Sequence, residues 1–311
     1  MSTIVCGSIA FDNIMSFEGK FSEHIIPDKL EMLNVSFLVP GMRQEFGGCA
    51  GNIAYNLKKL GSNPLVSGSV GKDFSAYAEW MDKNRIERRF ISETTDSYTA
   101  QAFIITDSVG NQITAFHPGA MENPSRHPVF EIEADFAIVS PDSKKAMIEN
   151  CNQLSAAKIP FIFDPGQGTP MFDGDELMEL ISLSNWIIVN EYESKMIEAK
   201  SSLSSKQIAK EVDAYIVTLG DKGSKIYSND NKILVDAVSC ELPVDPTGCG
   251  DAFRAGFIFG LENKWSTIDA VRLGSVLGSV KVGSRGTQNH TLSKEGIKVL
   301  LDQNYKIRPR W

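Results

Sequence analysis

Long hydrophobic runs are missing from this sequence. No apolar segment approaches the length of about 18 residues that a membrane-spanning helix needs. The first residues lead into an apolar segment with neither a basic leader nor a small-residue cleavage site, the two marks of a secretory signal. We therefore expect a cytoplasmic protein that is neither secreted nor associated with a membrane.

Positive charge is in deficit. The chain has 31 Lys and Arg against 39 Asp and Glu, a formal net charge of −8, whereas proteins that bind nucleic acid concentrate positive charge on one face. We interpret the short basic patches at Lys58-Lys59 and 85–89 as solvated helix faces. The partner we expect is a small molecule and not a nucleic acid.

Cysteine is scarce and scattered. The five cysteines are odd in number and have no metal-ligand spacing, so we interpret them as reduced residues of a cytoplasmic protein and expect no zinc site. Internal repeats and low-complexity segments are also missing. The 311 residues, 42% hydrophobic and 23% charged, are enough for one large globular domain with an appendage.

Apolar strands alternate with helices over most of the chain, most regularly from Asp135 onward. This alternation predicts a parallel sheet covered by helices on both faces, with ligand sites at the carboxyl ends of its strands. The expected strands are 3–9, 65–70, 136–140, 161–164, 186–190 and 215–219, and the expected helices include 73–83, 141–158, 175–182, 191–200, 267–282 and 293–302.

Two segments break this alternation. Residues 13–46 lack a helical period, and residues 98–117 contain two β-rich runs joined by a turn, which is the pattern of a hairpin. We expect segments at about 13–46 and 97–121 to form a small β lid on one domain spanning residues 1–311. The side chains expected on the underside of the lid, either as ligand contacts or as packing, are Phe103, Phe116, His117 and Met121.

The most informative stretch is Asp-Pro-Thr-Gly-Cys-Gly-Asp-Ala-Phe at 245–253. Gly248 and Gly250 leave the backbone bare at a helix start, where unpaired amides and the helix dipole can hold an anion such as phosphate. Asp251 is placed to accept a proton from a hydroxyl group that attacks the phosphorus. The alternative is an ordinary acid that complements the helix dipole.

A second helix opens on glycines at 47–51 and ends at Gly61. Gly48 permits close approach of a ligand, and Asn52 offers a donor and an acceptor for sugar hydroxyls. The alternative is that the glycines serve only the turn and Asn52 is solvated. Asp12 lies just beyond the first strand, where ligands meet α/β sheets, and a turn-capping role is equally open.

Polar clusters follow three later strands, the first at 164–166. Asn190 and Glu193 lie one helical turn apart and suit Mg²⁺ held through water, or they cap the helix. The third cluster, 218–223, contains a Gly-x-x-Gly turn with Lys222. This turn permits contact with nucleotide phosphates, or it simply opens a hairpin.

These residues, in this order, resemble the ribokinase (PfkB) family of carbohydrate and nucleoside kinases over nearly the whole chain. The stretch 245–251 matches the second signature of that family, with a cysteine where alanine is more usual, and 47–52 matches the first. The resemblance implies a three-layer α/β/α sandwich with a mostly parallel central sheet and a small β lid.

The resemblance also implies roles for single residues. Asp251 would be the base, and the amides of Gly248, Cys249 and Gly250 would form the anion hole. The cofactors implied are ATP, Mg²⁺ and a monovalent cation such as K⁺. The remaining implied roles are substrate hydroxyls for Asp12, Gly48 and Asn52, ATP for Thr218, Gly220 and Gly223, Mg²⁺ for Asn190 and Glu193, and the monovalent cation for Asp245 and Thr247.

Within the family, 245–251 and Phe-His-Pro-Gly-Ala-Met at 116–121 look most like bacterial nucleoside kinases of the adenosine kinase type. We expect phosphorylation of the 5′-hydroxyl of a ribonucleoside, with adenosine favoured. The alternatives are a kinase for free fructose or ribose and a catalytically silent nucleotide or sugar sensor on the same fold. A monomer and a homodimer both remain open, with the dimer favoured.

Overall fold

A nine-stranded sheet runs through the centre of the computed structural model, which describes residues 1–26, 31, 34–228 and 231–309. The strand order is β13-β12-β11-β10-β9-β8-β1-β4-β5. β12 and β13 run antiparallel to their neighbours and all other pairs are parallel, which confirms the predicted sheet. The strands are β1 Ser2–Cys6, β4 Asn63–Val70, β5 Ile91–Glu93, β8 Phe136–Val139, β9 Phe161–Phe163, β10 Trp186–Asn190, β11 Ala214–Thr218, β12 Ser224–Ser228 and β13 Asn231–Val235.

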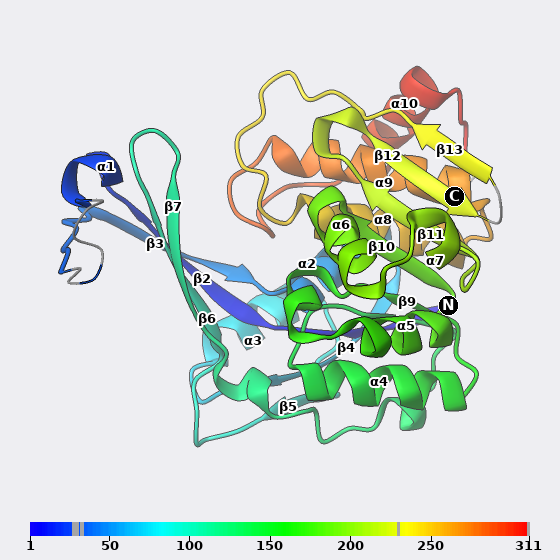
Figure 1. The fold of residues 1–311 in the computed structure, drawn as a ribbon, viewed down its shortest axis with the longest axis horizontal. Coiled ribbons are helices and arrows are strands. Elements are labelled where there is room, and N and C mark those ends of the chain that lie inside the picture. Colours follow the sequence, from blue (N-terminus) through cyan, green and yellow to red (C-terminus); the bar gives the residue numbers. More distant parts are fainter. Residues whose placement is uncertain (27–30, 32–33, 229–230, 310–311) are drawn as a thin grey trace.

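Helices cover both faces of this sheet and complete the predicted three-layer sandwich (Figure 1). Because side chains alternate along a strand, Val5 packs into one hydrophobic core while Ile4 and Cys6 pack into the other. On the Val5 side lie α2 Cys49–Leu60, α3 Ser75–Lys83, α8 Cys249–Glu262, α9 Thr267–Val282 and α10 Lys294–Tyr305, and on the other side α4 Lys144–Ala156, α5 Gly174–Leu183, α6 Glu191–Ser201 and α7 Ser205–Ile208.

A second sheet of four strands, in the order β3-β2-β6-β7, extends away from the helical layers (Figure 1). We call these strands the lid sheet. β6 and β7 form the predicted hairpin, and β2 pairs with β3 on one side and with β6 on the other. The bounds are β2 Ala10–Ser16, β3 Gly41–Gly47, β6 Ala100–Thr106 and β7 Gln112–His117, with the short helix α1 Phe21–His24 at the far end of the sheet.

One predicted site residue lies in a different element from the one that the sequence predicted. Asp12 lies inside β2, in the lid sheet, because β1 ends at Cys6 and a new strand begins at Ala10. Of the segment 13–46, residues 27–30 and 32–33 lie outside the described part of the chain. The short 3₁₀ helices are η2 Gly119–Glu122, η3 Val129–Glu131, η4 Gly166–Met171 and η5 Gly220–Lys222.

The parallel strands end at a common edge of the central sheet, where the predicted polar clusters follow them. Asn190 and Thr218 are paired in register at the ends of β10 and β11, and Asp164 directly follows β9. This edge therefore collects the clusters as the alternation predicted. Over the described ranges, no helix has both the length and the apolar character needed to cross a membrane.

Candidate active site

Unpaired backbone amides lie at the start of α8. Gly248, with φ of 77°, adopts the left-handed backbone that favours glycine and turns the chain into the helix. Within the described residues, the amides of Gly248, Gly250 and Asp251 have no hydrogen-bond partner, whereas the Cys249 amide donates to the carbonyl oxygen of Pro246 at 3.1 Å. Free amides at the positive end of a helix dipole can hold an anion such as phosphate.

A buried hydrogen-bond network orients the carboxylate of Asp251. Asn52 Nδ2 donates to Asp251 Oδ2 at 2.8 Å, and Gln288 Nε2 donates to Asn52 Oδ1 at 3.0 Å. Gln288 is held in turn by Trp80 Nε1, which donates to its Oε1 at 2.9 Å, and by Tyr77 Oη, which accepts from its Nε2 at 2.6 Å. The side chain of Asn52, predicted to bind substrate, therefore also fixes Asp251.

Arg254 lies one helical turn after Asp251 and pairs with Asp164. Its Nη2 donates to Asp164 Oδ1 at 2.7 Å, and its Nε lies against the other carboxylate oxygen. Burial raises the pKa of Asp251, and the Arg254 guanidinium opposes that rise. Arg254 thus favours the ionised Asp251 that can accept a proton. Sequence reasoning missed Arg254, although a single cation within the apolar run 252–261 was a usable signal.

Asp12 faces the start of α8 from the lid sheet. Burial raises its pKa to about 7, and the nearby carboxylates of Asp251, Glu45 and Asp245 add to the effect. In the described part of the chain, the side chain of Asp12 has no hydrogen bond or ion pair, so its carboxylate oxygens remain available to accept hydrogen bonds from a ligand. The Asp12 carboxylate also occupies the space beside Gly47, where a methyl group would lie 2.5 Å from its Oδ2.

Gly48 serves close packing of the backbone. It has φ of 83°, and a methyl group on it would lie 2.5 Å from the carbonyl oxygen of Ser8. The strand-to-helix turn between β3 and α2 can therefore lie directly against the link between β1 and β2. This contact brings Asn52, on α2, and Asp12, on β2, to the same region.

The strand register places the two phenylalanines that were predicted to contact substrate on opposite faces of the lid sheet. Asp12 pairs with Ala102, and Ala102 with Phe116, whereas Phe103 pairs with Asn13. Directly paired residues share a face of a sheet, so Phe116 lies on the Asp12 face and Phe103 on the opposite face. Both side chains are open to solvent, Phe116 at 51% and Phe103 at 40% exposed. The lid sheet thus offers one of the two predicted aromatic rings to the Asp12 side.

Asn190 and Glu193 cap α6 reciprocally. Asn190 Oδ1 accepts from the Glu193 amide at 2.8 Å, and Glu193 Oε2 accepts from the Asn190 amide at 2.7 Å. Within the described ranges, no group of three or more His, Cys, Asp or Glu side chains could hold a metal directly. These two residues therefore fit only an ion such as Mg²⁺ that keeps its waters and is held mainly by substrate phosphates.

The predicted nucleotide turn joins β11 to β12. Thr218 Oγ1 donates to the carbonyl oxygen of Val189 at 3.4 Å. Gly220 has open space where a side chain would be, and Lys222 is exposed. Gly223 lies so close to the carbonyl oxygen of Val235 that a methyl group would clash. The turn thus presents bare backbone and one cation beside the ends of β10 and β11.

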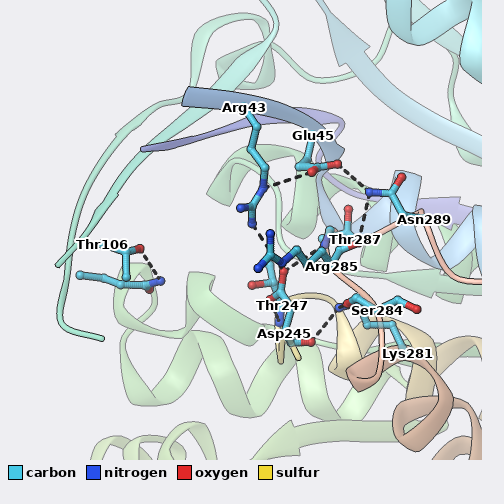
Figure 2. Close-up of polar contacts among 12 residues, drawn as sticks. Arg43, Glu45, Thr106, Asp245, Thr247, Lys281, Ser284, Arg285, Thr287 and Asn289 are labelled. Carbon is cyan, nitrogen blue, oxygen red and sulfur yellow. Dashed lines mark hydrogen bonds and ion pairs between the residues drawn. The ribbon is translucent and has the colours of Figure 1, made fainter. Parts of the chain in front are cut away.

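Asp245 anchors the loop before α8 to the loop after α9 (Figure 2). Burial acts to raise its pKa, but hydrogen bonds from the amides of Thr247 and Gly286 hold the pKa below its ordinary value. Lys281 Nζ donates to the carbonyl oxygens of Asp245 and Ser284 at 2.8 and 3.1 Å. Burial lowers the pKa of Lys281, and the nearby carboxylates oppose that change.

The lid sheet reaches the same loops through charged side chains. Arg43, on β3, lies 3.2 Å from Glu45 and 3.9 Å from Asp245, measured between the nearest charged atoms. Glu45 in turn accepts a hydrogen bond from Asn289 Nδ2 at 2.7 Å (Figure 2). These contacts link the lid sheet to the loops around the start of α8.

Comparison with known proteins gives three kinds of match. Residues 19–294 match the profile of the pfkB family carbohydrate kinase. A nucleoside kinase of Methanocaldococcus jannaschii is 30% identical over 307 residues, which cover 98% of each chain. The structure of Burkholderia thailandensis nucleoside kinase in complex with inosine is 44% identical, with a TM-score of 0.91 and coverage of 99% of this chain and 100% of that one. The ADP-inosine complex of the same protein has a TM-score of 0.88, with coverage of 99% and 97%.

Proposed function

The chain belongs to the pfkB family of carbohydrate kinases and is an ATP-dependent kinase with an alcohol acceptor, and we propose that the acceptor is the 5′-hydroxyl of a purine ribonucleoside, adenosine favoured. The observation that carries this proposal is the position of Asp251, which lies among unpaired amides and near the unpartnered Asp12 of the lid sheet. The inosine complex of the Burkholderia thailandensis protein and the name of the Methanocaldococcus jannaschii relative support a nucleoside acceptor.

In this mechanism Asp251 accepts the proton of the attacking hydroxyl, and Asn52 and Arg254 keep its carboxylate oriented and charged. The amides of Gly248 and Gly250 stabilise charge on the transferred phosphoryl group, joined by that of Cys249 if it leaves Pro246. Mg²⁺ would neutralise phosphate charge, with Asn190 and Glu193 contacting its waters. The ATP phosphates would lie along the turn 218–223.

Substrate recognition falls to the lid sheet and α2. Asp12 accepts hydrogen bonds from ribose hydroxyls, and the remaining N–H of Asn52 donates to one of them. Gly48 keeps the backbone close enough for both. Phe116, on the Asp12 face, covers the flat apolar surface of the purine. An apolar wall separates a nucleoside from a free sugar but does not separate adenine from hypoxanthine, so adenosine and inosine both enter the test.

The test is ADP release from Mg-ATP with adenosine, inosine, guanosine, ribose and fructose as acceptors. We expect kcat/KM for at least one purine nucleoside to exceed that for either sugar by roughly 10–100-fold, the value of one base–aromatic contact. If ribose or fructose matches or exceeds every nucleoside, the free-sugar kinase replaces the nucleoside kinase. If no acceptor is phosphorylated while ATP binds, the silent sensor replaces both.

A further inference from the structure

Lys281, in the last turn of α9, is fully buried, with 0% of its surface exposed. Lysine is almost never buried without partners, because its charge leaves water only where hydrogen bonds replace the lost hydration. Its partners are the two backbone carbonyl oxygens of Asp245 and Ser284 (Figure 2). Over the described residues, no carboxylate lies within ion-pair distance of its Nζ. The chain thus holds this nitrogen as it would hold a small cation.

The two carbonyls belong to the loops that set the start of α8. Asp245 lies three residues before Gly248, and its amide donates to the carbonyl oxygen of Val282 at 3.0 Å. Its carboxylate accepts from the amides of Thr247 at 2.9 Å and Gly286 at 3.0 Å. Lys281 therefore lies at the junction that fixes the path of the backbone into Gly248.

The predicted monovalent-cation site at Asp245 and Thr247 can be tested against these contacts. Hard cations are held in proteins by carboxylate and carbonyl oxygens. Here the Asp245 carbonyl already accepts from Lys281, and both Asp245 carboxylate oxygens accept from backbone amides. The Lys281 ammonium group therefore already brings to the Asp245 carbonyl oxygen the single positive charge that a K⁺ ion would bring there.

We propose that the ammonium group of Lys281 is a built-in replacement for the monovalent cation and holds the anion hole in shape without K⁺. The proposal rests on the anion-hole role given to Gly248 and Gly250 above. A lysine ammonium group and an alkali ion each bring one positive charge to carbonyl oxygens. The tethered group loses no translational freedom each time the site forms. Phosphoryl transfer by this protein is then independent of the alkali ion in solution.

The first arm of the test uses the unaltered protein. kcat and KM for ATP are measured in KCl, NaCl and tetramethylammonium chloride at constant ionic strength. We expect the three salts to give the same kcat and KM within about twofold, a difference of about 0.4 kcal/mol. Activity that requires K⁺ would overturn the proposal, whatever any variant does.

The second arm removes the side chain. Lys281→Ala should lower kcat roughly 10–100-fold in tetramethylammonium chloride, because small displacements of catalytic groups have effects of this size. K⁺ or NH₄⁺ should restore activity in a saturable manner, since each can enter the space that the ammonium group left. Equal activity of the folded variant in all salts would show that Lys281 is structural only and would overturn the proposal.

The control variant is Lys200→Ala. Lys200 Nζ also donates to two backbone carbonyl oxygens, those of Pro170 and Phe172, but on the opposite face of the sheet. Thermal unfolding provides a readout that does not depend on activity. We expect K⁺ and NH₄⁺ to raise the melting temperature of Lys281→Ala and to leave that of Lys200→Ala unchanged. Equal salt effects on both variants would contradict the proposal.

The two proposals can fail separately. If the preferred acceptor proves to be a sugar, the salt series is run with that sugar and the Lys281 proposal is still decided. If Lys281→Ala does not fold, the effect of the three salts on kcat and KM of the unaltered protein decides the Lys281 proposal alone. A K⁺ requirement in the unaltered protein would leave the nucleoside assignment intact.

Discussion

The start of α8 and the lid sheet hold their polar and aromatic groups in different ways. Around α8, Asp251 is held by Asn52, and the side chains of Arg254 and Lys281 are buried and hydrogen-bonded. On the lid sheet, Phe116 is 51% exposed and the Asp12 carboxylate has no hydrogen-bond partner among the described residues. Groups that need a fixed geometry are thus held by hydrogen bonds, whereas groups that select a ligand have exposed surface or unpaired polar atoms.

This difference predicts a division of effects. Substitutions around the start of α8 should lower kcat with little change in nucleoside binding. Substitutions on the Asp12 face of the lid sheet should change KM and the choice of acceptor more than kcat. A lid substitution that abolished turnover of a bound substrate would contradict this division of effects between the start of α8 and the lid sheet.

The largest effect is expected for Asp251→Asn. Losing a positioned proton acceptor should lower kcat by roughly 10²–10⁴ while ATP binding and the melting temperature stay close to the unaltered protein. The measurements are kcat at saturating substrates and ATP titration calorimetry. Asp269→Asn, which changes an acid in the first turn of α9, is the matched control and should retain full activity. Near-normal turnover of Asp251→Asn would remove this residue from the mechanism.

The next effect is expected for Gly250→Val. A side chain at this position would press on Arg254, since even a methyl group lies 2.6 Å from its Nη1, and would cover the unpaired amides. We expect kcat to fall roughly 10²-fold, the scale for losing a donor of an oxyanion hole. Gly296→Val, in the first turn of α10, controls for valine in a helix. Undiminished turnover would mean that phosphate does not bind at α8.

Asp12→Asn should act on substrate binding and on stability in opposite directions. Weakening the acceptor for the ribose hydroxyls should cost about 1–3 kcal/mol of transition-state binding free energy. This loss corresponds to a kcat/KM lower by roughly 5–150-fold. The folded-state pKa of about 7 lies above the ordinary value of Asp, so the folded protein binds the extra proton between roughly pH 4 and 7. The free energy of unfolding contributed by Asp12 therefore falls as the pH rises through that range.

Two measurements check this account of Asp12. Nucleoside KM should rise as the pH falls through about 7 in the unaltered protein, and Asp12→Asn should lack that dependence. At neutral and higher pH the variant should also melt at a higher temperature, because it carries no buried charge. A lower melting temperature together with unchanged KM would place Asp12 in a purely structural role.

The smallest effect is expected for Phe116→Ala. Losing one aromatic contact should lower kcat/KM for a purine nucleoside by roughly 10-fold and leave the value for ribose unchanged. Phe103→Ala is the matched control, because the register places Phe103 on the opposite face. Equal losses for the two variants would mean that the Asp12 face does not select the base.

The sequence predicted features that depend on local pattern. The strand and helix alternation, the two glycine-opened helices and the hairpin are present, because periodicity and glycine placement act over short distances. Features that depend on long-range contacts were missed. The pairing of Arg254 with Asp164 joins residues 90 positions apart, and Gln288 reaches Asn52 across 236 positions. No local pattern encodes such partners.

Register and backbone pairing account for the other differences. The sequence alone could not place Phe103 and Phe116 on opposite faces, because that requires the β6–β7 register. Nor could it show that the Cys249 amide donates a hydrogen bond to the carbonyl oxygen of Pro246. Lys281 did leave a signal, since it follows Leu273 and Leu277 at helical spacing on the buried face of α9. A cation on such a face requires a partner that only the fold supplies.

The central claim is phosphoryl transfer to the 5′-hydroxyl of a purine nucleoside by the group of residues around Asp251. Its most direct test is the product formed from adenosine or inosine and Mg-ATP, identified by ³¹P NMR, with 5′-deoxyadenosine as the matched acceptor that lacks the reacting hydroxyl. We expect the nucleoside 5′-monophosphate in one-to-one ratio with ADP, and no nucleotide product from 5′-deoxyadenosine. Phosphorylation of 5′-deoxyadenosine, or of the 2′- or 3′-hydroxyl of adenosine, would contradict it.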